Sequence, residues 1–397
     1  MNYVKFLLAL AVTLTFVLTP SSTFAEDQDT DKDIVVLIDG RVVKGKVFSS
    51  TYKEVKLASQ TIDAREVSHI TYFDTPPDYI EALDMIERGE YENAKFKLKL
   101  ALEAKNVRDW LKLYVEIQRA EIMWRQNMWT EARKKYRELN KDYPESFFLR
   151  MTSWRIPLTL MKQNNYKNAE QAFEDIVNDP RFRDEPIHWR AWFWKIFTIE
   201  LRDENREAYQ QYLNLGQKCK QALPLEVKQA MIKNDPISEK HKGMVKIYLE
   251  ATYRGYVNMA ISGKVREAYK EFDELSDKSS KMEKAIGIIG KAICDVVEIA
   301  NAGEINRENL DKLDKARLEL AKSNLMYASN NDRRADLFYW AGKAALLADD
   351  KEQAVSYFKM VATQYPASLI SKACEKELDK LGVEPDVPEE KAPAEPE

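Results

Sequence analysis

Cysteine, histidine and glycine are scarce in this chain of 397 residues, which has 3 Cys, 3 His and 12 Gly. That composition excludes a disulfide scaffold and a collagen-like or low-complexity chain. The shortage of glycine favours helix, and the length allows two or three domains. The three cysteines, Cys219, Cys294 and Cys374, are far apart in the chain. We therefore expect them to be small buried residues on helices, and the spacing does not decide whether two of them form a disulfide.

Sequence patterns for catalysis and for metal or cofactor binding are also missing. His69, His188 and His241 are far apart and do not have the spacing of metal ligands. The chain has no Gly-x-Ser-x-Gly elbow and no glycine-rich dinucleotide turn. We therefore expect no catalytic residues, no metal and no cofactor. An enzyme with a site built from distant residues is left as a third alternative.

A phosphate-binding loop is excluded at the one place that resembles it. Gly40 and the pair Gly45-Lys46 have the spacing of such a loop, but Val47 stands where a magnesium-binding hydroxyl is needed. These glycines also lie in a strand pattern, whereas such loops hold phosphate at the N-terminus of a helix. We therefore expect no nucleotide.

Charge of one sign does not dominate the body of the chain. The net charge is −4, from 61 basic and 65 acidic residues. Residues 382–397 hold six acids and one base, and Lys5 is the only charge in residues 1–25, so the segment between them is neutral overall. A neutral body lacks the basic surface of a nucleic-acid binder. The Pro- and Glu-rich tail 382–397 is predicted to be disordered, and Arg333-Arg334 to lie on a solvated helix face.

One long hydrophobic run is present, at the N-terminus. After Lys5, residues 6–18 form a 13-residue apolar run broken only by two threonines, and Thr23-Phe24-Ala25 ends it with small residues at the cleavage positions. This pattern predicts a signal peptide over 1–25, with a linker over 26–32, because a membrane span needs about 20 apolar residues. An uncleaved anchor is the alternative. We expect export to a bacterial periplasm, or secretion, without a later membrane segment.

Residues 33–74 have a different pattern from the rest of the chain. The β-branched run Ile34–Ile38 is followed by the hairpin signal Asp39-Gly40, and further short apolar segments follow. The stretch Leu37-x-Asp39-Gly40-x-x-x-x-Gly45-x-Val47 resembles the first hairpin of Sm-like barrels. The residues 67–70 do not match the second RNA-contacting signature of that family, so the resemblance does not imply RNA binding. We predict a small SH3-like β module of four or five strands. It either has a function of its own or caps the end of the helical array.

From Thr75 onward, apolar residues recur with the period of a helix, and one pattern repeats. An alanine is followed four and seven residues later by larger apolar residues, which places all three on one helical face. Gly or Asn stands five residues before four of these alanines, and Pro144 and Pro366 lie 12 residues after two of them. The alanines are Ala94, Ala132, Ala169, Ala208, Ala268 and Ala354, and the four preceding residues are Gly89, Asn127, Asn164 and Gly263.

This pattern resembles the tetratricopeptide (TPR) repeat, which packs two antiparallel helices through small residues. The best copy has Gly342, Ala354, Phe358 and Pro366, with a capping signal at residues 349–352. The first spacings are 38, 37 and 39 residues, longer than the usual ~34, so helices or loops are longer. We predict a mainly α fold: a TPR-like α-solenoid of antiparallel helix pairs behind a small β-barrel-like module. Its parts are four repeats over 75–216, an insertion over 217–240, and further repeats with a closing helix over 241–381.

The resemblance implies that the first helix of each pair lines a concave groove. Counting in the repeat register gives eight candidate groove residues: Trp124, Trp154, Met161, Arg190, Phe193, Phe197, Tyr253 and Tyr339. The alternative is that these side chains pack between the long helices. The leading hypothesis is a non-catalytic envelope scaffold that binds a partner protein or peptide in this groove. A second hypothesis is an adaptor for an envelope glycan; the partner and the oligomeric state cannot be read from the sequence.

Overall fold

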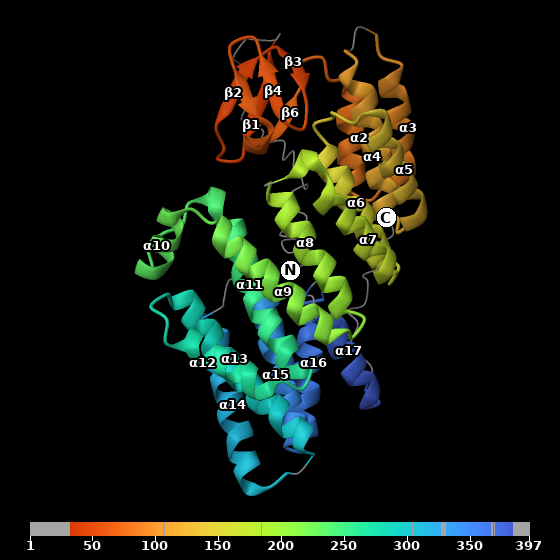
Figure 1. The fold of residues 1–397 in the computed structure, drawn as a ribbon. Coiled ribbons are helices and arrows are strands. Elements are labelled where there is room, and N and C mark those ends of the chain that lie inside the picture. The colour runs from red at the N-terminus through yellow and green to blue at the C-terminus, as the bar shows by residue number, and fades with distance from the viewer. Residues whose placement is uncertain are drawn as a thin grey trace. The chain divides into compact units, whose positions relative to one another are not determined.

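The computed structural model describes residues 32–383, apart from 106–107, 184, 304, 327–330, 367 and 369. The predicted signal peptide and nearly all of the predicted tail lie outside the described residues. The chain forms two compact units, Met1–Ala191 (unit 1) and Trp192–Glu397 (unit 2), and each is described by itself (Figure 1). Within the described residues, no helix has the length and apolar character needed to cross a membrane.

Unit 1 begins with a β module of six short strands, arranged as two three-stranded antiparallel sheets in the orders β2-β1-β6 and β3-β4-β5. The predicted hairpin at Asp39-Gly40 joins β1 to β2, with Gly40 at φ +85°. The structure has more strands than the four or five predicted. The strands are β1 (Asp33–Leu37), β2 (Val42–Gly45), β3 (Val47–Ser50), β4 (Glu54–Leu57), β5 (Thr61–Asp63) and β6 (Val67–Thr71).

The β module shares its core with the first helices. Its buried valines, leucines and isoleucines pack against Trp110 and Tyr114 of α4 (Trp110–Arg125). Arg108, just before that helix, donates from Nη1 to Asp33 at 2.9 Å and from Nη2 to Asp74 at 2.8 Å. Burial opposes ionisation of Asp74, but the hydrogen bonds from Arg108 outweigh it and lower the pKa of that carboxyl to about 2. The module is therefore held to α4 by apolar packing and by a shared arginine.

The helices of unit 1 follow the predicted change of pattern after Thr75. The first begins at Pro77, where a proline suits the first helical position, and α5 ends two residues before Pro144. The bounds are α2 (Pro77–Glu87), α3 (Tyr91–Leu102), α4 (Trp110–Arg125), α5 (Trp129–Asp142), α6 (Leu149–Lys162) and α7 (Tyr166–Asn178), followed by α8 (Pro186–Glu200), which crosses into unit 2.

Unit 2 continues with longer helices. The segment 217–240 contains the last turns of α9, the short helix α10 and the turn before α11. The predicted closing helix is present as α17, whose Cys374 and Leu378 are fully buried. The bounds are α9 (Asn205–Ala222), α10 (Leu225–Lys233), α11 (Glu239–Ile261), α12 (Val265–Ser276), α13 (Lys281–Ala302), α14 (Arg307–Met326), α15 (Asn331–Leu347), α16 (Lys351–Gln364) and α17 (Ser371–Lys380).

The helices form TPR-like pairs, and the recurrent alanines lie inside them. We call the first helix of a pair an A helix (α2, α4, α6, α8, α11, α13, α15) and the second a B helix (α3, α5, α7, α9, α12, α14, α16). All six alanines of the pattern have no exposed surface. At Gly342, which we predict to be the small position of the last pair, an added Cβ would lie 2.6 Å from the ring of Phe358. The predicted fold, a TPR-like α-solenoid behind a small β module, is confirmed.

The turn between the two helices of a pair has one conformation in six pairs. The residue five places before each alanine has a left-handed backbone, which lets the A helix end and the B helix begin two residues later. Sequence reasoning identified four of these positions from their Gly or Asn. It missed Asp203 and Asp349, which have φ of +61° and +60°. The fixed spacing to the alanine was the signal that could have found them.

Candidate binding surface on the A helices

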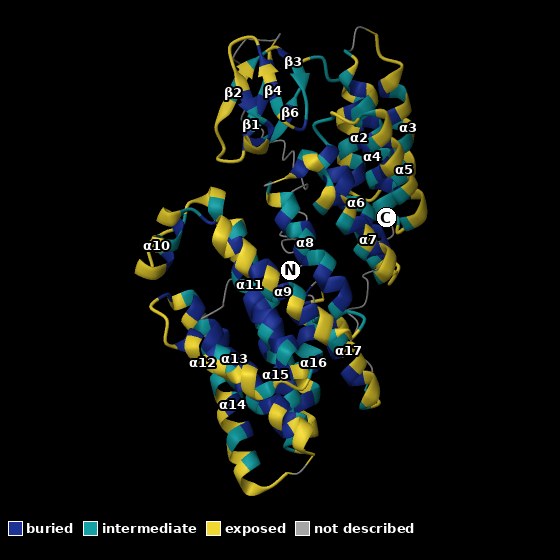
Figure 2. Ribbon diagram, in the orientation of Figure 1, coloured by how far each residue is buried: buried dark blue, intermediate teal, exposed yellow. Residues whose placement is uncertain are grey.

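The eight predicted groove residues all lie on A helices, but they differ in exposure. Figure 2 shows buried positions along the A helices of both units. Four of the eight are buried: Trp154, Phe193, Phe197 and Tyr253 are between 1% and 8% exposed. The other four keep part of their surface: Trp124, Met161, Arg190 and Tyr339. Contact with a partner stays a prediction for all eight.

In unit 1, arginines stack on tryptophans along the A helices. The guanidinium carbon of Arg155 lies 4.4 Å from the ring centroid of Trp124, and its nitrogens bind Glu121 at 2.6 and 3.1 Å. Arg190 lies 4.3 Å from the ring centroid of Trp154. Burial lowers the pKa of Arg190 to about 10, so its guanidinium stays charged at neutral pH. These contacts place cations on partly covered aromatic faces.

In unit 2, three of the four predicted groove aromatics are buried against neighbouring side chains. Phe193 lies 5.5 Å from the ring of Tyr212 on α9, and Phe197 lies beneath the guanidinium of Arg254 at 5.3 Å. Tyr253 is covered by Arg333, whose guanidinium carbon is 3.6 Å from the ring centroid. These contacts are what the alternative of packing between helices predicts within unit 2, and contact with a partner stays a prediction.

A buried network of charges connects three A helices of unit 2. Arg254 on α11 donates to Glu200 at 2.7 Å and to Glu250 at 2.9 Å. Arg333 on α15 donates to the second oxygen of Glu250 at 2.7 Å and lies 3.6 Å from Asp336. The expectation that Arg333 lies on a solvated face is wrong, because its side chain is 4% exposed. The sequence could not show that Arg333 pairs with an acid of α11, Glu250, which lies far from it in the chain.

Acids exceed bases in this network. Burial raises the pKa of Asp336, although Arg254 and Arg333 act against the shift, and the hydroxyl of Tyr253 donates to its carboxylate. Burial and the neighbouring Glu250 also raise the pKa of Asp332. Four carboxyl groups therefore face two arginines and the longer-range charge of Lys246, and the protonation state of the interior depends on pH in the acid range.

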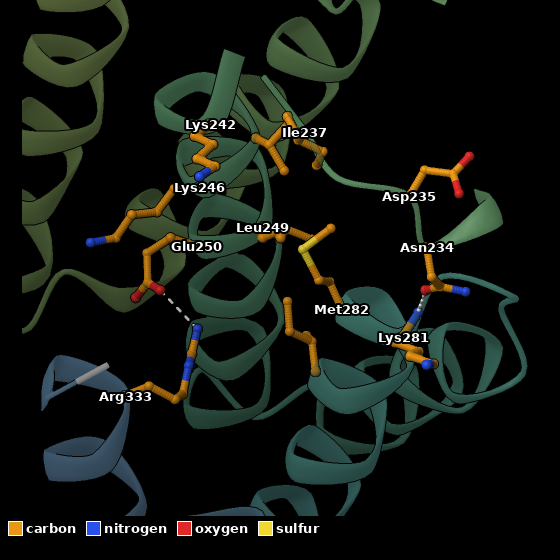
Figure 3. Close-up of a pocket in the computed structure, with 12 residues that line it drawn as sticks. Asn234, Asp235, Ile237, Lys242, Lys246, Leu249, Glu250, Lys281, Met282 and Arg333 are labelled. Atoms are coloured by element: carbon orange, nitrogen blue, oxygen red, sulfur yellow. Dashed lines mark hydrogen bonds and ion pairs between the residues drawn. The ribbon is translucent and has the colours of Figure 1, made fainter. Parts of the chain in front are cut away.

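A cleft opens next to the network, between the turn after α10, α11, α13 and α15. It encloses about 550 Å³. Figure 3 shows Lys242 and Lys246 of α11 on one side and Lys281 of α13 on the other, with Glu250, in the middle of α11, paired to Arg333 of α15. The apolar lining consists of Ile237, Val245, Leu249, Met282 and Ile286.

The cleft could not be found by counting positions of the repeat, because part of its lining lies outside the repeats. Lys242, Lys246 and Glu250 follow one another at four-residue intervals, which places them on one face of a helix. One wall comes from residues 234–237, inside the predicted insertion. The basic stripe on a helix next to an insertion was the available signal.

The histidines and cysteines lie in separate environments. His188 Nδ1 is 3.1 Å from the carbonyl oxygen of Val177, and His241 Nδ1 is 3.0 Å from the hydroxyl of Ser238. Across the residues that the structure describes, no three His, Cys, Asp or Glu side chains are grouped so that they could hold a metal ion. The three cysteines, Cys219, Cys294 and Cys374, are buried free thiols whose pKa is raised by burial.

Comparison with known proteins supports the repeat architecture. Residues 116–146 and 336–368 match the tetratricopeptide repeat family, and they correspond to the pairs α4–α5 and α15–α16. No curated protein matches the sequence.

Solved structures show limited likeness to this chain. A TPR protein from Parabacteroides merdae is 16% identical, with 77% of this chain and 99% of that chain covered and a TM-score of 0.44. The apo form of RapI is 10% identical, with coverage of 76% and 98% and a TM-score of 0.41. The TPR domain of P58(IPK) is 10% identical, with coverage of 77% and 78% and a TM-score of 0.24. The fold assignment therefore rests on the repeat match and on the packing of the alanines.

Proposed function

We propose that this protein is an exported, non-catalytic adaptor of the bacterial cell envelope, which binds a partner protein or peptide on its A helices. The observation that carries the proposal is the cleft on the A helices of unit 2, where an apolar lining and three lysines border a charge pair that is already satisfied. Repeat arrays commonly use extended surfaces to bind partners. Export is supported by the signal-peptide pattern of residues 1–25.

Site-specific photocrosslinking in cells tests the binding surface. A photoreactive phenylalanine analogue replaces Trp124 on α4 or Met282 on α13, both partly exposed on A helices. The matched control is Leu318 on the B helix α14, which is 54% exposed. We expect discrete crosslinked proteins from at least one A-helix position and none from Leu318. The same products from all three positions, or none from either A helix, would contradict the proposal. Products that resist protease and yield to glycan-degrading enzymes would favour the glycan adaptor instead.

Cell fractionation tests the location. We expect the mature chain in the periplasmic or secreted fraction, with its N-terminus after Ala25. Mass spectrometry of that N-terminus is the measurement. A chain that stays in the cytoplasm with residues 1–25 intact would contradict export and leave the binding surface to be judged by crosslinking alone.

A further inference from the structure

We propose that the cleft of unit 2 binds a short acidic peptide segment with one bulky apolar side chain. The proposal rests on the proposed function and specifies the chemistry of the partner. The cleft has a volume of about 550 Å³, inside the roughly 300–1,000 Å³ of typical ligand sites. It is therefore large enough for an apolar side chain and its neighbours, and too small for a folded domain.

The lining of the cleft provides the apolar half of the recognition. Val245 and Ile286 are each 3% exposed and form a fixed base, while Leu249 and Met282 keep partly exposed surface. Met282 can adapt its shape to an entering side chain because its thioether is flexible. An apolar group that enters here exchanges water for contact with these four side chains. A polymer with only hydroxyl or phosphate groups would leave this surface unused, which favours a peptide over a glycan.

The rim provides the charged half. Lys242, Lys246 and Lys281 are exposed and lie on opposite sides of the apolar lining. Lys242 pairs with Glu239, whose side chain is 83% exposed and can be displaced. Among the described residues, neither Lys246 nor Lys281 has a carboxylate within ion-pair distance, although Lys246 acts at longer range on Glu250 and Asp332. Both side chains are exposed, so a ligand can reach their ammonium groups.

The acid inside the cleft does not cancel this charge. Both oxygens of Glu250 are held by arginines, one by Arg254 and one by Arg333. Each of its two oxygens therefore already accepts a hydrogen bond from an arginine. Asp235 is the other acid in the lining, so the available charge at the rim is positive. Carboxylates that flank an apolar anchor would meet lysines on both sides.

A synthetic peptide tests this chemistry on the full mature chain. The probe is a fluorescein-labelled peptide, acetylated and amidated, with a central Leu-Phe pair and three glutamates on each side. Two control peptides replace the glutamates by glutamine or the Leu-Phe pair by Ser-Ser. We expect fluorescence anisotropy to show binding of the probe that weakens as salt is raised, and clearly weaker binding of both controls.

Variants of the rim locate the binding. The K246Q/K281Q double variant removes two exposed lysines that line the cleft, and K240Q/K284Q removes two exposed lysines of the same helices that do not. We expect the first to weaken binding roughly fivefold to tenfold and the second to leave it unchanged. M282S should weaken the probe and not the Ser-Ser control. Circular dichroism checks that each variant stays folded.

Several results would overturn the inference. They are a probe that does not bind at millimolar concentration, equal losses from the two lysine pairs, or a glutamine peptide that binds as well as the acidic one. Partner crosslinks in cells without probe binding would remove this inference and leave the proposed function standing. Absence of any A-helix crosslink would remove the proposed function itself, whatever the peptide does.

Discussion

The A helices of unit 1 and unit 2 use arginine in different ways. In unit 1, Arg155 binds one acid, Glu121, and stacks on a tryptophan that stays partly exposed. In unit 2, Arg254 and Arg333 share Glu250 inside a network that holds more acids than bases. Similar helix pairs thus hold an isolated, largely buried ion pair in one unit and a connected network of charges in the other. The connected interior should be more sensitive to loss of one cation and to pH.

Replacing one arginine in each unit should give the largest difference in stability between the two units. R333M leaves the buried Asp336 and the partly exposed Glu250 with one cation fewer, and we expect a loss of about 3–5 kcal/mol in the stability of unit 2. R155M leaves only Glu121, which still accepts a hydrogen bond from Tyr136 at 2.7 Å, so the loss in unit 1 should be about 1–2 kcal/mol. Calorimetry gives the transitions, and hydrogen exchange with mass spectrometry assigns them. Equal losses would break the comparison.

Replacing an aromatic residue by alanine should distinguish a side chain that packs in the interior from one that binds a partner. F193A removes a side chain that is 6% exposed and packed on Tyr212, so we expect about 3–4 kcal/mol of destabilisation. W124A removes a partly exposed ring and should cost about 1–2 kcal/mol, with a clear loss of partner capture. Urea unfolding and crosslinking yield are the two readouts. If F193A unfolds like the wild type and loses the partner, Phe193 belongs to the binding surface after all.

The response to acid should differ in sign between the units. Burial raises the pKa of Asp336 above 3.8, so its contribution is greatest below that pH and is lost as pH rises through the folded-state pKa. Asp74 in unit 1 has a pKa of about 2, so its contribution is present above 3.8 and is lost as pH falls towards 2. Glu250 has a lowered pKa and opposes Asp336 below its ordinary value of 4.5.

The pH test therefore compares wild type and D336N from pH 7 down to 3.8, the ordinary pKa of aspartate, because the folded-state pKa of Asp336 is raised above that value. Glu250 is present in both proteins. We expect the advantage of D336N over wild type at pH 7 to shrink as the medium is acidified, because wild-type Asp336 becomes protonated. The melting temperature of unit 2 is the measurement. A difference between the two proteins that stays constant across this range would show that Asp336 does not titrate there.

Substitutions in the turns between paired helices should have the smallest effects on stability. Gly89 and Asp203 occupy the same position of the pair and have left-handed backbones, with φ of +79° and +61°. G89A should destabilise unit 1 by about 1 kcal/mol, whereas D203G should stabilise unit 2 by about 0.5–1 kcal/mol, because glycine alone adopts this conformation without strain. Urea midpoints measure both. If D203G is less stable than the wild type, the side chain of Asp203 itself stabilises the turn.

The helix pairs could be predicted from the sequence because their determinants are local. The alanine spacing, Gly89 and Pro144 each act within one or two turns of chain, and all describe the pair that the structure contains. The β module was predicted less completely, since the short strand Thr61–Asp63 has little apolar pattern of its own.

The candidate site depended on contacts between distant helices and could not be predicted in the same way. Arg333 lies 83 positions from Glu250 in the chain, and nothing near it indicates burial. The register count selected aromatics such as Tyr253, whose exposure is decided by neighbours on α15. The cleft combines α11 and α13 with the turn after α10, which lies outside the repeat pattern.

Hydrogen exchange of the full chain with a crosslink-identified partner tests the central claim most directly. The account predicts that the partner slows exchange of the backbone amides around Lys246 of α11 and Lys281 of α13, while α12, α14 and α16 stay unchanged. Protection confined to those B helices, or to strands of residues 33–71, would contradict a binding surface on the A helices.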